Sequence, residues 1–350
     1  LDVDNIDAPL QLSLDTNVQA EVERLLAGGM RVMNAKGAAA VLMDVHTGEV
    51  IALASLPNFD PNERPVGSGL DPDNPIFNRA VQGVYELGST FKIFAAAQGM
   101  ELEAVSPETM VGIQGPIRFG RFRISDSFYL GEELSVSDII VQSSNVGTAR
   151  IAQMIGVDLQ QQFFRDLGML EETSLELAET SRGKPMLPKK WTELTSMTIS
   201  YGHGLAVSPV HLAAGYAALA NGGYKINPTL LSKEQHNLGP RLVSESVAKA
   251  SVAMLRKVVT EGTAKRYGDV PGYEVAGKTG TSEKFTKDGY DRDRVLASYA
   301  SVFPANDPKY VLVVIMDEPV NEFGIKPSRT ASMTAVPVAA AIISHIAPLL

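Results

Sequence analysis

Three short motifs place nucleophilic, basic and amide side chains in an ordered series along the chain. The first is S-x-x-K at Ser89 to Lys92, the second is S-x-N at Ser143 to Asn145, and the third is K-T-G at Lys278 to Gly280. S-x-x-K also occurs at Ser181 to Lys184 and at Ser246 to Lys249, but both of these copies follow the S-x-N motif. Only Ser89 therefore opens the series in the order that serine acyl-transfer chemistry uses.

The spacing of Ser89 and Lys92 suits a serine nucleophile with a lysine base. Two side chains three residues apart on a helix share one face. A serine hydroxyl needs a base to become a good nucleophile, and a neutral lysine amine can serve without any histidine. Partial burial and the second cation, Lys278, would both lower the pKa of Lys92. We therefore predict that Ser89 is the acylated residue and that Lys92 takes its proton.

The third motif overlaps a pattern with a different meaning. Gly272 to Thr279 fits G-x-x-x-x-G-K-[ST], the phosphate loop of nucleotide hydrolases, and the run Tyr310 to Pro319 resembles a magnesium-holding strand. A phosphate loop needs a helix directly after its lysine, because the helix N-terminus holds the phosphates. Here Thr281 to Arg294 is polar and is interpreted as an exposed loop, with Glu283 to Arg294 either a mobile flap or a plain hairpin loop. A nucleotide site is therefore disfavoured.

Composition excludes several classes of partner and site. The 350 residues include 31 Lys and Arg against 40 Asp and Glu, a net charge of −9, and no basic cluster stands out. Nucleic acid is therefore not an expected partner. The chain has no cysteine, which rules out a thiol nucleophile and a thiolate metal site. We expect neither a metal nor a cofactor.

No stretch of the sequence predicts a membrane span. The best candidate, Ala335 to Leu350, is short and is interrupted by Pro337, His345 and Pro348, so a C-terminal helix packed on a sheet is expected. The chain begins without an initiator Met or a signal peptide. We therefore expect a piece of a longer protein, with an upstream anchor and an N-terminal domain absent from it.

Hydrophobic periodicity predicts strands near both ends of the chain. A helix is expected from about Asp15 or Thr16 to a stop at Gly37, and a hairpin over Ala38 to Ser55. After Gly272 the pattern is again that of strands, and a final helix is expected at about 330–348.

The middle of the chain, roughly 135–260, is mostly helical in period. Together these segments predict an α/β (α+β) fold in which helices flank an antiparallel sheet. The sheet lobe is expected to comprise about 1–80 and 265–350, and an all-helical lobe about 90–262.

In its three motifs and the segments around them, the chain resembles the transpeptidase domain of class B penicillin-binding proteins, and most of all the cell-division, septal FtsI type. The resemblance covers nearly the whole chain and rests on "YELGSTFK", "QSSNVGTARIA", "YGHGLAVSPVHLAAGYAALANGG" and "VAGKTGTSEK". It implies the penicillin-binding and serine β-lactamase-like fold. Ser144 stands where S-D-N motifs have Asp, and Leu87 where Pro often precedes the Gly-Ser pair.

The resemblance also implies a role for each motif residue. Ser89 attacks a stem peptide ending in D-Ala-D-Ala, Lys92 takes its proton, and Ser143 relays a proton to the leaving D-Ala. Lys278 supplies positive charge, and the backbone amides of Ser89 and Thr281 form the oxyanion hole. The residues implied to bind the substrate are Asn145, Thr279, Gly280 and Thr281. An amine from a neighbouring stem peptide then takes the acyl group, which crosslinks the cell wall.

Partners and location follow from the same resemblance. It implies peptidoglycan stem peptides and β-lactam antibiotics as ligands. It also implies a membrane-embedded glycan polymerase and division proteins as partners, and a place at the periplasmic face of the bacterial inner membrane. A D,D-carboxypeptidase, a β-lactamase or a non-catalytic β-lactam sensor remains an alternative. A β-lactamase needs a further general base, often Glu, for which no convincing motif follows Asn145. His203, between two glycines, is interpreted as structural.

Overall fold

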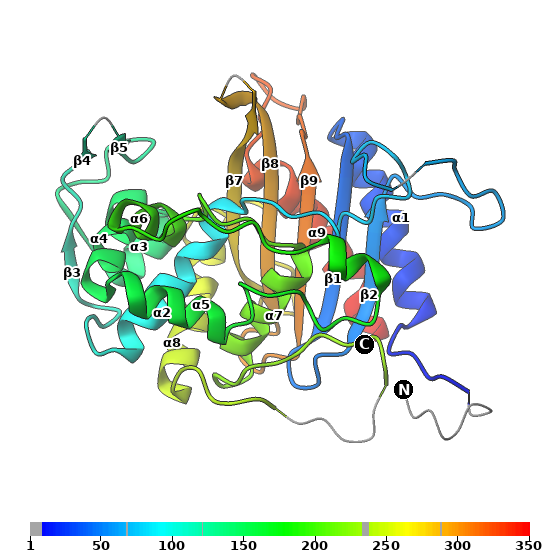
Figure 1. Ribbon diagram of the computed structural model, residues 1–350, viewed down its shortest axis with the longest axis horizontal. Coiled ribbons are helices and arrows are strands. Elements are labelled where there is room, and N and C mark those ends of the chain that lie inside the picture. Colours follow the sequence, from blue (N-terminus) through cyan, green and yellow to red (C-terminus); the bar gives the residue numbers. More distant parts are fainter. Residues whose placement is uncertain (1–8, 68, 121, 233–237, 288) are drawn as a thin grey trace.

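The computed structural model describes residues 9–350 except 68, 121, 233–237 and 288. Residues 1–8 of the predicted sheet lobe therefore lie outside the described residues. Figure 1 shows one central sheet with helices in front of it and behind it, and a group of helices beside its β7 edge.

The sheet is antiparallel throughout and joins the two ends of the chain. Its strand order is β2-β1-β9-β8-β7. The N-terminal and C-terminal strands meet at β1 and β9, where Gly37 pairs with Asp317 and Asp44 with Tyr310. The strands are β1 (Gly37–Asp44), β2 (Val50–Leu56), β7 (Ala276–Thr286), β8 (Gly289–Phe303) and β9 (Tyr310–Asp317).

The central strands are apolar along their length because helices cover both faces of the sheet. Helix α7 (Pro209–Ala220) contacts β1, β8 and β9 in front of the sheet in Figure 1. Helix α9 (Ala335–Ile346) contacts β8 and β9 behind it, next to α1 (Thr16–Val32). The predicted hairpin and the predicted C-terminal helix are thus confirmed. Over the described residues, no helix combines the length and the apolar character needed to cross a bilayer.

The group of helices beside the sheet is built around α2. In α2 (Lys92–Glu101) every residue from Lys92 to Met100 is buried, because all of them except Lys92 and Gln98 are small or apolar and the neighbouring helices surround it. It follows directly from the 3₁₀ turn η1 (Gly88–Phe91). The other helices and 3₁₀ turns are α3 (Val136–Gln142), α4 (Asn145–Ile155), α5 (Val157–Asp166), α6 (Glu193–Ser200), α8 (Glu245–Thr260), η2 (Ala178–Arg182), η3 (Ala331–Met333) and η4 (Ala347–Leu349).

The predicted fold class, an antiparallel sheet flanked by helices, is confirmed, but three local predictions are wrong. The first helix ends at Val32 and not at Gly37, which instead opens β1. The predicted all-helical lobe, about 90–262, also contains two small sheets, which were missed because each of their strands is only three residues long: β3 (Met110–Gly112), β4 (Ile117–Phe119), β5 (Phe122–Ile124) and β6 (Glu133–Ser135).

The third wrong prediction is the exposed loop or flap at 281–294. Most of it is the outer end of β7 and β8, where Lys284 pairs with Asp291 and Phe285 with Tyr290 beyond a bulge. Both faces of this hairpin extension meet solvent, so it lacks the apolar alternation that identifies strands. Residue 288, within the predicted flap, lies outside the described residues.

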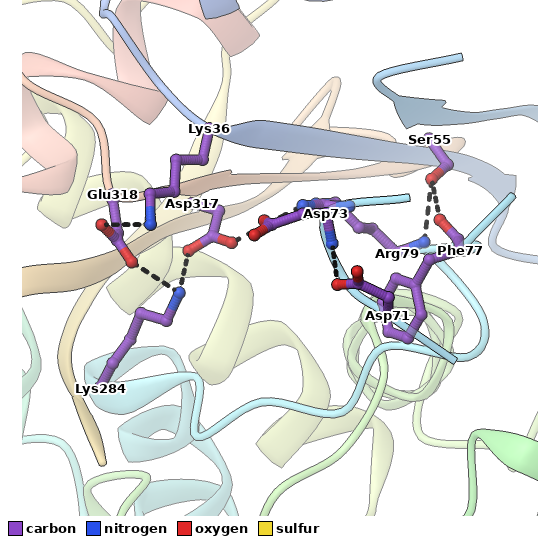
Figure 2. A network of polar contacts seen from close by, with 9 residues as sticks. All are labelled: Lys36, Ser55, Asp71, Asp73, Phe77, Arg79, Lys284, Asp317 and Glu318. Carbon is purple, nitrogen blue, oxygen red and sulfur yellow. Dashed lines mark hydrogen bonds and ion pairs between the residues drawn. The ribbon is translucent and has the colours of Figure 1, made fainter. Parts of the chain in front are cut away.

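Linked ion pairs lie around the C-terminal end of β9 (Figure 2). Lys284 Nζ lies 2.7 Å from Asp317 Oδ1 and 3.0 Å from Glu318 Oε1, and Lys36 Nζ lies 3.2 Å from Glu318 Oε2. Arg79 is buried, and its Nη2 lies 3.9 Å from Asp317 Oδ2. The Arg79 guanidinium makes no hydrogen bond with any described residue. Asp317 thus links a half-exposed lysine to a buried arginine.

Candidate active site

Ser89 lies on a tight turn that leads into the buried helix α2. Gly88 has φ +57°, a left-handed conformation that glycine adopts without steric cost. The carbonyl of Leu87 accepts hydrogen bonds from Thr90 Oγ1 at 2.9 Å and from Ser298 Oγ at 3.1 Å. Hydrogen bonds therefore fix the turn internally and to β8. The turn holds the half-buried Ser89 at the N-terminus of α2.

Two fully buried lysines converge on the hydroxyl of Ser143. Lys92 Nζ donates to the carbonyl oxygen of Ser143 and lies 3.1 Å from its Oγ. Lys278 Nζ lies 2.9 Å from the same Oγ and 3.3 Å from the carbonyl oxygen of Thr279. The structure thus brings together one member of each sequence motif. The Ser89 hydroxyl makes no hydrogen bond within the described part of the chain.

The two lysines perturb each other because they are close and buried. Burial lowers the pKa of Lys92 well below its usual range, the positive charge of Lys278 lowers it further, and the carboxylate of Asp126 partly opposes both. Burial lowers the pKa of Lys278 to about 7. The lowered pKa favours the neutral form of Lys92, which can accept a proton, and Lys278 is partly charged near pH 7.

The S-x-N motif occupies the break between α3 and α4. Ser143 ends α3 with φ +62° and ψ +44°, a left-handed conformation that costs on the order of 1 kcal/mol or more for a residue other than glycine. Ser144 is the N-cap of α4, and its hydroxyl accepts the N–H of Gly147 at 2.9 Å. This abrupt change of direction presents the Ser143 side chain to both lysines.

Asp126 supports this motif and was missed in the sequence. Its carboxylate accepts hydrogen bonds from Ser144 Oγ at 2.8 Å, from the N–H of Asn145, and from the N–H of Val146 at 3.2 Å. Ser144 stands where S-D-N motifs have Asp. Because Ser144 replaces that Asp, the sequence motif lacks a carboxylate. Asp126, in the loop after β5, supplies one here.

The K-T-G motif lies on β7 beside the nucleophile turn. Gly280 allows close approach, since a Cβ there would lie 2.3 Å from the carbonyl oxygen of Leu87. Thr279 Oγ1 lies 2.7 Å from Thr263 Oγ1, and Thr281 Oγ1 accepts the N–H of Ala331 at 3.0 Å. The motif therefore adjoins the nucleophile turn at Gly280 and reaches Ser143 through Lys278.

The two other S-x-x-K copies lack this environment. Ser181 lies in η2 and Ser246 in α8, and both serines are exposed. Their lysines, Lys184 and Lys249, are also exposed and pair with Glu172 and Glu245. Neither lysine therefore shares the burial of Lys92.

Residues 38–344 match the family model described as the penicillin binding protein transpeptidase domain. The chain belongs to this family. In sequence it is 35% identical to a probable peptidoglycan D,D-transpeptidase FtsI of Caulobacter vibrioides, over 98% of this chain and 59% of that protein. It is 30% identical to the peptidoglycan D,D-transpeptidase FtsI of Escherichia coli, over 89% of this chain and 52% of that protein.

Solved structures of penicillin-binding proteins share the fold. The transpeptidase domain of Burkholderia pseudomallei penicillin-binding protein 3 matches with a TM-score of 0.84 and 30% identity, over 97% of this chain and 96% of that one. Penicillin-binding protein 3 of Mycobacterium tuberculosis, in complex with aztreonam, matches with a TM-score of 0.84 and 26% identity, over 97% and 79%.

The family and the fold together overturn the nucleotide alternative. Lys278 lies near the start of the antiparallel strand β7, and the chain continues as that strand where a phosphate loop would start a helix. The chain spans 59% and 61% of the first two curated relatives it matches.

Proposed function

We propose that this chain is a serine D,D-transpeptidase that crosslinks peptidoglycan stem peptides and is acylated by β-lactams. The observation that carries the proposal is the Ser143 hydroxyl held between two buried lysines, of which Lys92 follows Ser89 by one helical turn. Membership of the transpeptidase family and the FtsI names of its relatives support it.

In the acylation step, Ser89 Oγ forms a bond to the carbonyl carbon of the penultimate D-Ala. The neutral amine of Lys92 takes the hydroxyl proton. Backbone N–H groups of Ser89 and Thr281 hold the oxyanion of the tetrahedral intermediate. The C–N bond to the terminal D-Ala then breaks, and the proton passes from Lys92 through Ser143 to the leaving nitrogen.

The remaining motif residues hold the substrate. Lys278 contributes positive charge, and Thr279 and Thr281 contact the carboxylate of the terminal D-Ala beside Gly280. Asn145 donates a hydrogen bond to the bound peptide. A β-lactam undergoes the same attack, but its leaving nitrogen stays attached to the acyl group.

The wider role is part of the same proposal. From the FtsI names of its relatives, we infer that the full-length protein works in septal cell-wall synthesis. It would be anchored at the periplasmic face of the inner membrane, beside a membrane-embedded glycan polymerase and division proteins. The sheet and the helices around α2 would act as two lobes of one transpeptidase domain, with the site between them.

Intact-mass spectrometry after incubation with penicillin tests the nucleophile. One adduct per chain is expected, and it should disappear in Ser89→Ala. The matched controls are Ser181→Ala and Ser246→Ala, which remove the exposed copies and should keep the adduct. An adduct that survives Ser89→Ala would refute the assignment.

The lifetime of the adduct separates the proposal from hydrolase alternatives. No deacylating base was found by motif, so the acyl-enzyme should persist and nitrocefin should be consumed about once per protein molecule. Turnover at roughly ten per second, an ordinary enzyme rate, would instead identify a β-lactamase.

A further inference from the structure

The β4–β5 hairpin stands out from the group of helices, at the edge of the molecule opposite α1 (Figure 1). Three pairs of its residues lie directly across from each other: Ile117 and Ile124, Arg118 and Arg123, and Phe119 and Phe122. Residues directly across from each other point to the same face, so the two arginines lie together. Like charges in this arrangement destabilise a sheet, and a two-stranded hairpin has little stability to lose.

The two arginines have no acidic partner among the described residues. Arg118 and Arg123 are both exposed, and neither forms an ion pair or a hydrogen bond with a described residue. Other arginines do: Arg24, Arg256 and Arg292 each pair with a carboxylate of this chain. A sequence that gives up stability without a structural gain usually does so at a functional site. The arginine pair therefore points to a ligand that supplies the missing negative charge.

A cavity of about 460 Å³ adjoins the hairpin. Arg123 and Ser125 line it, together with Phe128 and Tyr129 from the connection between β5 and β6. These two aromatic side chains are 65% and 84% exposed. Exposed aromatic residues and arginine are the residue types that contribute most to binding between proteins. The cavity also adjoins the S-x-N motif, since the carbonyl oxygen of Ser125 accepts Asn145 Nδ2 at 3.2 Å.

The two carboxylates that line the cavity are engaged elsewhere. Asp126 accepts hydrogen bonds from Ser144 Oγ and from backbone N–H groups at the start of α4. Glu132 Oε2 accepts Gln114 Nε2 at 3.4 Å. Neither carboxylate forms an ion pair with Arg123 in the part of the chain that the structure describes. The guanidinium of Arg123 therefore keeps its donors for a carboxylate from outside the chain.

The geometry of the pair favours a peptide over a small anion or a membrane. A guanidinium binds a carboxylate through two parallel hydrogen bonds, so two guanidiniums side by side suit two carboxylates. Alternate side chains of an extended peptide lie about 7 Å apart on one face, close to the spacing of residues across a hairpin. A single small anion would leave the aromatic residues without a contact. An anionic membrane would be repelled by the net charge of −9 and by the exposed Glu132 and Glu133.

We propose that the arginine face of the β4–β5 hairpin and the cavity beside it form a docking site for an acidic segment of a partner protein. Two carboxylates of that segment bind Arg118 and Arg123, and an apolar side chain of the segment packs against Phe128 and Tyr129. This inference goes beyond the proposed function and does not rest on it, because neither arginine takes part in the proposed chemistry.

Fluorescence anisotropy with the full chain tests the site. The probe is a short labelled peptide in which Glu residues at alternate positions are followed by Phe. A second peptide has Gln in place of every Glu, and a third has Ser in place of Phe. The Glu peptide should bind about twenty-fold more tightly than the Gln peptide, the effect of two exposed ion pairs. Tyr129→Ser should weaken the peptide with Phe and should leave the peptide with Ser unchanged.

Two double variants isolate the arginine pair. Arg118→Gln with Arg123→Gln should weaken binding of the Glu peptide about twenty-fold, and each single change about five-fold. The matched control is Arg31→Gln with Arg165→Gln, two exposed arginines on α1 and α5 that carry the same change of net charge. The control should alter the affinity by less than about two-fold, because salt screens distant charges.

A stability measurement guards against a structural role for the pair. Since the two charges repel each other, Arg118→Gln should not lower the free energy of unfolding in urea titrations. Weaker peptide binding with unchanged stability supports the docking site. Equal affinities in the two double variants, or equal binding of the Glu and Gln peptides, would overturn it.

Two other occupants would also overturn the proposal. Binding to vesicles that contain anionic lipid, without binding to the Glu peptide, would identify a membrane contact. Self-association in analytical ultracentrifugation that disappears in Arg118→Gln with Arg123→Gln would identify a second copy of this chain. Neither measurement needs an acyl-enzyme, so a failure of penicillin to acylate the chain would refute the proposed function and leave the docking site standing.

Discussion

Asp126 offers the sharpest test of how the site is positioned. It accepts hydrogen bonds from Ser144 Oγ and from the backbone N–H groups of Asn145 and Val146. In Asp126→Ala, these donors at the N-terminus of α4 lose their shared acceptor. Losing one capping interaction costs about 1 kcal/mol, and the cost is larger when the acceptor is charged. We therefore expect urea titrations to show that the free energy of unfolding falls by about 2 kcal/mol.

The milder variant Asp126→Asn separates support from charge. The amide oxygen can still accept the two backbone N–H groups, so the stability loss should be about half as large. Acylation by penicillin should slow about ten-fold, because the adjacent Ser143 is less firmly held. The carboxylate of Asp126 raises the pKa of Lys92, so removing its charge lowers that pKa further. Since neutral Lys92 is the active form, the acid limb of the acylation rate should move to lower pH.

This shift in the acid limb is the decisive observation. The control is Asp138→Asn on α3, whose carboxylate bonds to the hydroxyl of Ser135 and touches no residue of the S-x-N motif. It should leave the acid limb unchanged. If Asp126→Asn weakens the fold but leaves both the acylation rate and its pH profile unchanged, Asp126 has no part in preparing the site.

Two further predictions concern buried charges. The acylation rate should fall as the pH rises through about 7, because Lys278 then loses its charge; Lys278→Arg keeps the charge and should abolish this alkaline limb in stopped-flow measurements. Asp317→Ala leaves Arg79 without its carboxylate and should lower the free energy of unfolding by about 3 kcal/mol. Arg79→Met should change it by less than about 1 kcal/mol in urea titrations, since the guanidinium makes no hydrogen bond with a described residue. Equal losses in these two variants would contradict the last argument.

The motif residues of the site were easier to predict from the sequence than the residues that hold them in place. Ser89, Lys92, Ser143 and Lys278 lie in short motifs whose spacing is set by one turn of helix or by adjacent strand positions, and local sequence carries that information. The burial that lowers the pKa of Lys92 follows from an apolar helix, which the sequence also shows.

What could not be predicted depends on contacts between distant segments. Asp126 reaches the S-x-N motif from another loop, and nothing near Asp126 in sequence marks it as a cap for α4. The outer hairpin of β7 and β8 is largely polar and meets solvent on both faces, so its strands are defined by pairing between the two arms and not by apolar alternation. Glu86 is a single residue whose partners, Gly204 and Tyr290, are known only once the chain is folded.

The pairing of β1 with β9 also has a consequence for how the protein is made. The apolar strand β1 emerges early, yet its partner β9 starts only at Tyr310. At ordinary rates of synthesis, β1 waits on the order of ten seconds to a minute with one edge open. An apolar strand with an unpaired edge invites aggregation, so the nascent chain has a period in which it needs shielding by a chaperone. Lys278 also arrives late, so covalent capture by a labelled penicillin would report completed folding and could count finished molecules during synthesis.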